Sequence, residues 1–175
     1  TQAEFLKQKY NLMHLSTGDI FRFNIKNDTD LGQLAKQYMD KGDLVPDAVT
    51  IKMLEDIVNK NLNSAGFLFD GFPRTLAQAI ELDDFLSNKK WNIAATIALE
   101  ANDEILINRI LERGKTSGRT DDQDEEKIRH RYQEYNEKTA PLIEYYKKQN
   151  KFYPVNGIGS IAEITERLSK VIDNL

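Results

Sequence analysis

Apolar residues occur in two patterns that alternate along the chain. Short continuous apolar runs bounded by polar or turn residues are typical of buried strands, and apolar positions that recur every three or four residues are typical of helices. Strands are predicted at residues 12–15, 67–69, 93–99 and 152–155. Helices are predicted at residues 4–10, 19–27, 31–39, 48–62, 76–87, 103–112 and 125–149, the last being broken at Pro141, and after Ser160.

This alternation predicts an α/β fold, an open and doubly wound parallel sheet with helices on both faces. The chain has 175 residues, which suits a single domain over 1–175. A polar, glycine-containing stretch at 114–123 interrupts the apolar rhythm and predicts a mobile flap.

Several residues are placed to cap the predicted helices. Thr75 and Gln78 have the spacing of a capping box, as do Ser160 and Glu163, and Asp47 precedes the helix at 48–62 as its expected cap. The final helix carries one apolar stripe that is expected to be core: Ile161, Ile164, Leu168, Val171 and Leu175.

The segment Asp-Gly-Phe-Pro-Arg at 70–74 follows the apolar run 67–69 and carries the clearest chemistry. Ligands of parallel sheets lie beyond the carboxyl ends of the strands, where Asp70 is expected. Gly71 lets the backbone approach a ligand, and Arg74 offers a planar fork for phosphate oxygens. Glycine and proline alone would fit an ordinary strand-turn-helix junction, but the added aspartate and arginine favour a phosphate and metal site.

Composition narrows the class of protein. There is no cysteine, which excludes disulfides and thiolate zinc sites, and the apolar runs are far shorter than the ~20 residues of a membrane helix. The net charge of −4 argues against a broad nucleic-acid surface. We therefore expect a soluble intracellular protein without a signal-like opening, a membrane partner or a nucleic-acid partner.

Arginine is concentrated in one part of the chain. Of eight arginines, five lie in one stretch: Arg109, Arg113, Arg119, Arg129 and Arg131. Lysine would serve a solvated face equally well, whereas guanidinium suits bidentate phosphate recognition. The clustering favours an anion site.

Several motifs in sequence order resemble those of the adenylate kinase family in its short-lid form. They lie at 15–22, 42–46, 70–75 with Gln78, 118–122 and 128–131. The resemblance implies the fold of P-loop nucleoside monophosphate kinases with two inserted flaps. An AMP-binding flap would cover 16–45, or about 16–62 with its helices, and a short lid would cover 114–123. Asp121 and Asp122 would order this lid or form a solvated acidic turn.

The amino-terminal end departs from the family pattern. Family members begin with a strand and a P-loop that ends Gly-Lys-Gly-Thr-Gln, whereas this chain begins at Thr1-Gln2. The missing strand is expected near the middle of the sheet, so we expect the sequence to be part of a longer protein. Without the loop that wraps the donor phosphates, phosphoryl transfer should be crippled.

The implied reaction is reversible, magnesium-dependent transfer of a phosphoryl group from ATP to AMP, giving two ADP, by a cytoplasmic monomer. The implied AMP-binding residues are Thr17, Arg22, Asp43, Leu44, Val45, Gly71, Arg74, Gln78, Arg119 and Arg131. The implied ATP-binding residues are Thr1, Arg109, Arg113, Gly157, Ile158 and Gly159. The implied catalytic residues are Asp70, Arg74, Arg109, Arg113, Arg119 and Arg131.

Each implied role has a physical reason. Thr17 would meet the acceptor base, and Arg22 with Arg74 would hold the acceptor phosphate. The Gln78 amide can read the donor and acceptor pattern of adenine. Asp70 would orient magnesium through water, because this ion keeps much of its hydration shell.

Two alternatives stay open. A uridylate or cytidylate kinase is possible within the enzyme class, although Thr17 and Gln78 resemble the adenylate pattern. A non-catalytic AMP-binding module would fit if the P-loop is truly absent, although the donor-side arginines argue against it.

Several polar residues are expected to have no part in catalysis. His14 and His130 are interpreted as a strand residue and a surface residue, since direct phosphoryl transfer needs no such base. Arg129 and Arg167 are assigned to solvent. Arg131 is preferred to His130 as the site residue because its neighbours then keep the family pattern.

Overall fold

The four strands of the structure, a computed structural model that describes residues 1–175 apart from the side chain of Thr120, form two parallel pairs. Strand β1 (Met13–Ser16) pairs with β2 (Phe67–Asp70), and β3 (Thr96–Glu100) pairs with β4 (Phe152–Asn156). The predicted α/β class with parallel strands is confirmed, but the described strands make two pairs rather than one continuous sheet. An apolar run predicts a strand, but it does not show which other strand pairs with it.

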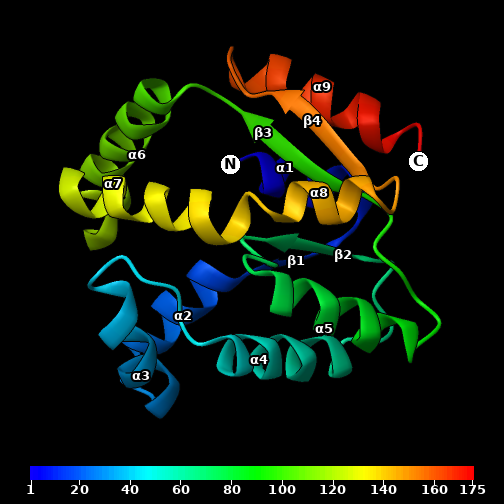
Figure 1. Ribbon diagram of the computed structural model, residues 1–175, viewed down its shortest axis with the longest axis horizontal. Helices are drawn as coiled ribbons and strands as arrows, with labels where there is room; N and C mark the ends of the chain where they lie inside the picture. Colours follow the sequence, from blue (N-terminus) through cyan, green and yellow to red (C-terminus); the bar gives the residue numbers. More distant parts are fainter.

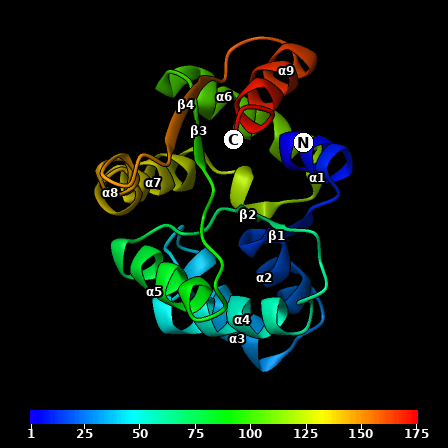
Figure 2. The same ribbon diagram turned by 90° about the vertical axis from the view of Figure 1, so that its right-hand side faces the viewer.

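Helices lie on both sides of these strands. In Figures 1 and 2, α2 to α5 lie on one side of the β1–β2 pair, and α9 and α8 lie on opposite sides of β4. The helices are α1 (Gln2–Tyr10), α2 (Thr17–Lys26), α3 (Asp30–Met39), α4 (Asp47–Asn59), α5 (Leu76–Ser87), α6 (Asp103–Ser117), α7 (Glu125–Glu134), α8 (Leu142–Lys147) and α9 (Ile161–Ile172), with a 3-10 turn η1 (Thr120–Asp122) and a π-helical turn η2 (Tyr135–Thr139). None of the described helices combines the length and hydrophobicity needed to cross a membrane.

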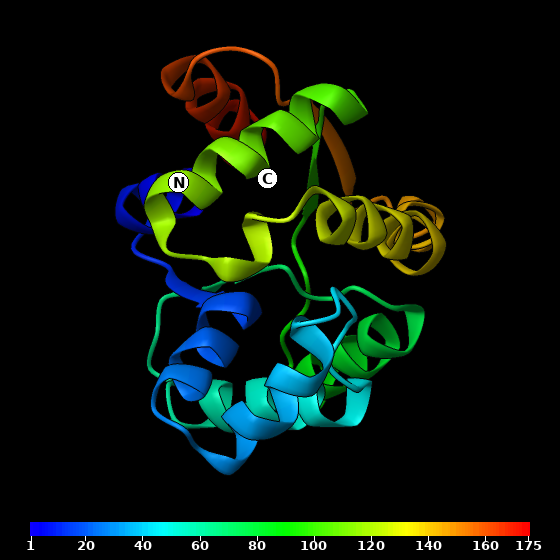
Figure 3. The same cartoon turned by 90° about the vertical axis from the view of Figure 1, so that its left-hand side faces the viewer.

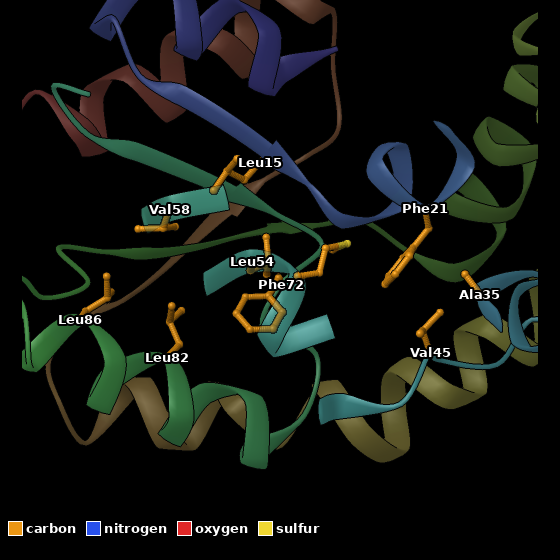
Figure 4. Packing of buried hydrophobic residues seen from close by; sticks show 10 residues of the cluster. Leu15, Phe21, Ala35, Val45, Leu54, Val58, Phe72, Leu82 and Leu86 are labelled. Atoms are coloured by element: carbon orange, nitrogen blue, oxygen red, sulfur yellow. The ribbon is translucent and has the colours of Figure 1, made fainter. Parts of the chain in front are cut away.

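The main core lies between the β1–β2 pair and α2 to α5 (Figure 4). Leu15 on β1 is 2% exposed, and Val58 on α4 is 1% exposed. Full burial of such a side chain contributes about 1.5–3 kcal/mol. Two smaller cores, one around Val155 and one around Tyr146, pack the other strand pair against α9, α1 and α8. The packing anchors the carboxyl ends of the strands, where the candidate site begins.

Some predicted boundaries are wrong. Helix α6 continues to Ser117, and the long helical region predicted at 125–149 breaks at the π-helical turn as well as at Pro141. The apolar stripe of α9 is buried at Ile164 and Leu168, but Ile161 and Leu175 are more than half exposed. Apolar periodicity shows which side of a helix is buried. It does not show how far along the helix the surface that covers this side extends.

Two cap predictions need correction. Pro46, not Asp47, stands at the N-cap of α4, and Asp47 directs its carboxylate to α5 instead. Thr75 does cap α5, since its Oγ1 accepts from the Gln78 N–H over 3.2 Å. The Gln78 side chain does not complete the box, because its Oε1 accepts from the backbone N–H of Arg74. The Ser160 and Glu163 capping box is confirmed.

Candidate functional site

The candidate site begins where β1 and β2 end side by side. Ser16 and Asp70 are partners in the last position of the ladder. Directly beyond, Thr17 Oγ1 donates to the carbonyl of Gly71 over 3.0 Å. Gly71 has a φ of +71°, which favours glycine. The two strands therefore deliver backbone and short polar groups to one point at the carboxyl edge.

A cavity of about 370 Å³ opens at this edge. Every residue predicted to bind AMP lines it: Thr17, Arg22, Asp43, Leu44, Val45, Gly71, Arg74, Gln78, Arg119 and Arg131. Thr1, Asp70 and Arg113, predicted for the donor nucleotide, the metal or catalysis, line the same cavity. Groups from distant parts of the sequence are thus brought together around a space lined mainly by polar atoms.

The guanidinium groups in the cavity repel one another. Burial of Arg74 lowers the pKa of its guanidinium, and the nearby charge of Arg131 lowers that pKa further. Arg22 acts in the same direction, whereas Asp70 and Asp121 oppose it. Arginine stays protonated at neutral pH, so this crowding is relieved by an anion rather than by loss of a proton.

Carboxylates from the start of α2 and from η1 bind these arginines. Asp19 Oδ1 accepts from Arg22 Nη2 over 2.7 Å and from Arg119 Nη2 over 2.7 Å. Asp121 Oδ2 lies 3.0 Å from Arg131 Nη1 and 3.6 Å from Arg22 Nη1. Burial of Asp19 would raise its pKa, but the two arginines outweigh burial and hold that pKa below its usual value of 3.8. The turn after α6 therefore lies against α2 (Figure 3).

Asp122, the last residue of η1, is fully buried. Its Oδ2 accepts from Arg113 Nε over 2.7 Å, and its Oδ1 accepts from Arg131 Nη1 over 2.9 Å. Burial would raise the pKa of Asp122, but these hydrogen bonds and charges lower it below 3.8. A solvated acidic turn is therefore the wrong interpretation for Asp122. Gly114 permits the packing, because a Cβ there would lie 2.4 Å from the Asp122 carbonyl oxygen.

Asp70 extends from β2 into the cavity and is about half exposed. His14 Nε2 lies 3.0 Å from its Oδ2, a partner that sequence reasoning missed because the alternation within one strand does not show which side chains of the neighbouring strand lie beside it. Among the described residues, no three His, Cys, Asp or Glu side chains group as a metal site. An open carboxylate without further protein ligands fits a hydrated Mg²⁺, which uses few protein groups and several waters.

Gln78 closes the inner wall of the cavity and is 2% exposed. Its amide contacts the Arg74 backbone and the Asp47 carboxylate. A buried amide of this kind has a fixed orientation and can present hydrogen-bonding groups to a ligand.

The other predicted donor-side residues lie outside this cavity, next to the β3–β4 pair. Arg109 Nη1 donates to the carbonyl of Gly157 over 2.6 Å, which joins α6 to the loop after β4. Arg167 Nη1 donates to the carbonyls of Asn156 and Ile158 over 2.8 and 2.6 Å. The assignment of Arg167 to solvent is therefore wrong, because its side chain holds residues 156–158. Gly159 follows in the same loop, with a φ of +132°.

Helix α7 supports the choice of Arg131 over its neighbours. Arg131 lines the cavity, whereas Arg129 is exposed and pairs with Glu125 over 2.8 Å. His130 Nε2 lies 2.8 Å from Asp43 Oδ1 and so connects α7 with the loop before α4. His130 therefore has a partner at the cavity wall that sequence reasoning missed, since 87 residues separate the pair.

Two kinds of comparison with known proteins agree. A family model described as adenylate kinase matches residues 1–151. The adenylate kinase of Flavobacterium psychrophilum is 77% identical over 175 residues, which cover 100% of this chain and 92% of that protein. The adenylate kinase of Flavobacterium johnsoniae is 72% identical with the same coverage, and that of Bacteroides fragilis is 42% identical with the same coverage.

Proposed function

The chain belongs to the adenylate kinase family, and we propose that its arginine-lined cavity binds AMP beside the phosphates of ATP. The reaction is reversible transfer of the terminal phosphoryl group of ATP to AMP, which gives two ADP. The enzyme is therefore a phosphotransferase. The proposal concerns which residues carry each part of this reaction.

The acceptor site is assigned to the wall formed by β1, β2 and α2. The convergence of Arg22 and Arg74 on one cavity carries this assignment. Both offer planar forks that match phosphate oxygens, and Arg74 is crowded by like charge until an anion enters. Thr17 and Gln78 in the same cavity would contact the base, while Leu44, Val45 and the backbone at Asp43 would line the adenosine pocket.

The donor site is assigned to the opposite wall and to the loop after β4. Arg113 in the cavity and Arg109, which lies outside it and contacts the Gly157 carbonyl, would bind the donor phosphates. Gly157, Ile158 and Gly159 would pass close to the donor adenine, and Thr1 would contact a phosphate. Arg119 and Arg131 line the same cavity and would spread over both phosphate chains as charge moves during transfer.

Magnesium is proposed as the metal, with Asp70 orienting it through water. When bound, the ion neutralises charge on the donor phosphates. The chain itself positions the acceptor phosphate and shields the reacting groups from water, and direct transfer between nucleotides needs no histidine base.

Two segments are proposed to move around the bound nucleotides. Residues 16–45, or about 16–62 with their helices, would form the AMP-binding flap, and residues 114–123 would form the lid. The ion pairs between Asp19 and Arg119 and between Arg22 and Asp121 support this division, because they join the two segments through exposed or partly exposed groups that are easily broken. A monomeric state and a cytoplasmic location are also proposed, testable by sedimentation and by cell fractionation.

The test of acceptor choice is a coupled assay with ATP and one monophosphate at a time. Activity with AMP should exceed that with CMP or UMP, because the paired amide of Gln78 matches adenine. Higher activity with CMP or UMP would overturn the adenylate assignment. No turnover with any monophosphate, together with tight AMP binding, would favour a non-catalytic binding module.

A further inference from the structure

Asp47 is a charged side chain for which the acceptor site just proposed has no role. It stands at the first residue of α4, does not cap that helix, and does not line the cavity. Its Oδ1 accepts from Gln78 Nε2 over 2.7 Å, and its Oδ2 accepts from Thr75 Oγ1 over 2.8 Å. Both oxygens therefore accept hydrogen bonds from the N-cap and first turn of α5, next to the amide assigned to the base of AMP.

We propose that Asp47 is a specificity-determining positioning residue that holds the Gln78 amide in the one orientation that accepts adenine and opposes 6-oxopurines. The proposal rests on the assignment of Gln78 to the acceptor base. It concerns the choice among purines, which that assignment leaves open.

The orientation of the amide follows from its two neighbours. The backbone N–H of Arg74 can only donate, and it contacts the Gln78 amide oxygen over 2.7 Å. A carboxylate can only accept, so Asp47 requires the Gln78 amide nitrogen. Turning the amide by 180° would place its N–H groups against the Arg74 N–H and its oxygen against the Asp47 carboxylate. At 2% exposure Gln78 has almost no water to relieve these contacts.

The fixed amide leaves one hydrogen-bond donor and one acceptor free. A carboxamide has two N–H donors and two lone pairs on oxygen, and Asp47 and Arg74 use one of each. Adenine presents an amino donor at C6 beside a ring-nitrogen acceptor, which matches this pair in order. Hypoxanthine presents an oxygen acceptor at C6 beside an N–H donor at N1, which is the reverse order. Only a turned amide would match hypoxanthine, and Asp47 opposes that turn.

Asp47 is itself held in place. Thr75 donates its hydroxyl proton to Asp47 while the same oxygen accepts from the Gln78 backbone N–H over 3.2 Å. Thr75, Asp47 and Gln78 thus form a closed ring of hydrogen bonds between α4 and α5. The carboxylate also lies in the first turn of α4, where the helix dipole favours a negative charge.

The test is Asp47→Asn, which keeps the shape of the side chain but can accept from or donate to Gln78. It removes one of the two contacts that oppose the turned amide and leaves the other, the backbone N–H of Arg74, in place. The kcat/KM values for AMP and IMP, with ATP as donor, are measured for the wild type and the variant. We expect the AMP-to-IMP ratio to fall about tenfold, the effect of losing one charge-assisted hydrogen bond. Asp56→Asn, which removes an exposed carboxylate from the same helix, is the matched control and should leave the ratio unchanged.

A purely structural role would lower both kcat/KM values by the same factor, and an unchanged ratio overturns the proposal. Calorimetric binding of AMP and IMP gives the same ratio if the variant turns over too slowly, and a thermal melt reports its folding. Gln78→Ala tests the base-reading role of Gln78 separately from the positioning role of Asp47. If Gln78→Ala abolishes discrimination while Asp47→Asn preserves it, only the role of Asp47 fails; if Gln78→Ala preserves discrimination, the base-reading assignment fails with it.

Discussion

Asp19 and Arg119 are 100 residues apart in the sequence, yet Arg119 Nη2 donates to Asp19 Oδ1 over 2.7 Å. The contact joins the start of α2 to the segment proposed as the lid. Asp19 is about half exposed, so the pair contributes little to global stability, at most about 1 kcal/mol. Its effect should therefore be on the position of the lid.

Asp19→Asn is expected to loosen residues 114–123 without unfolding the protein. Hydrogen exchange of the amides in this segment should be faster in the variant, while the melting temperature changes by only a few degrees. Asp40→Asn, which removes an exposed ion pair with Lys36, is the control and should leave this exchange unchanged. Unchanged exchange in Asp19→Asn would show that the pair does not hold the lid.

Replacement of Asp122, unlike that of Asp19, should strongly lower the stability of the whole protein. The Asp122 side chain is fully buried and receives hydrogen bonds from Arg113 and Arg131. Asp122→Ala leaves both guanidiniums without this partner, and we expect a loss of about 2–3 kcal/mol in the free energy of unfolding, since Arg113 is partly exposed to water. Urea denaturation measures this loss; a change below about 0.5 kcal/mol would contradict the role of Asp122.

The contribution of Asp122 to the free energy of unfolding should also be sensitive to acid. Because the folded-state pKa of Asp122 lies below its ordinary value of 3.8, its contribution is fully present above about pH 4 and is lost as the pH falls through the folded pKa. Between pH 5 and pH 2 the wild type should therefore lose more free energy of unfolding than Asp122→Asn does. Parallel pH profiles for the two proteins would refute this assignment.

Arg131 and Arg129 provide a matched pair on α7. Arg131→Lys keeps the positive charge beside Asp122 but loses the planar fork, so kcat should fall about 100-fold or more while the protein stays folded. Arg129→Lys changes an exposed side chain paired with Glu125 and should leave kcat within about twofold. The reverse result would move the site residue to Arg129.

Removal of the Arg167 side chain should weaken binding of ATP and leave binding of AMP unchanged. Arg167 holds the carbonyls of Asn156 and Ile158, and its removal frees the loop assigned to the donor adenine. Arg167→Ala should raise the KM for ATP roughly fivefold and leave the KM for AMP unchanged. Lys170→Ala, an exposed change on the same helix, is the control. An equal rise in both KM values would contradict the assignment of the loop after β4 to the donor site alone.

The sequence predicts most of the elements and the acceptor wall, because these depend on local pattern and on motifs whose order is preserved. It predicts neither the separation of the strands into two pairs nor the contacts of His14, His130, Arg167 and Asp47. Each of these contacts joins side chains whose pairing depends on how elements pack. Asp47 illustrates the limit: the local spacing makes it a plausible helix cap, and only its position opposite α5 shows that it binds Gln78 instead.

A crystal structure of the enzyme with AMP bound tests the assignment of the acceptor site most directly. We expect AMP in the arginine-lined cavity, with its phosphate within hydrogen-bond distance of Arg22 and Arg74 and its base edge at the Gln78 amide. AMP bound elsewhere, or in the cavity with its phosphate away from both arginines, would contradict this assignment.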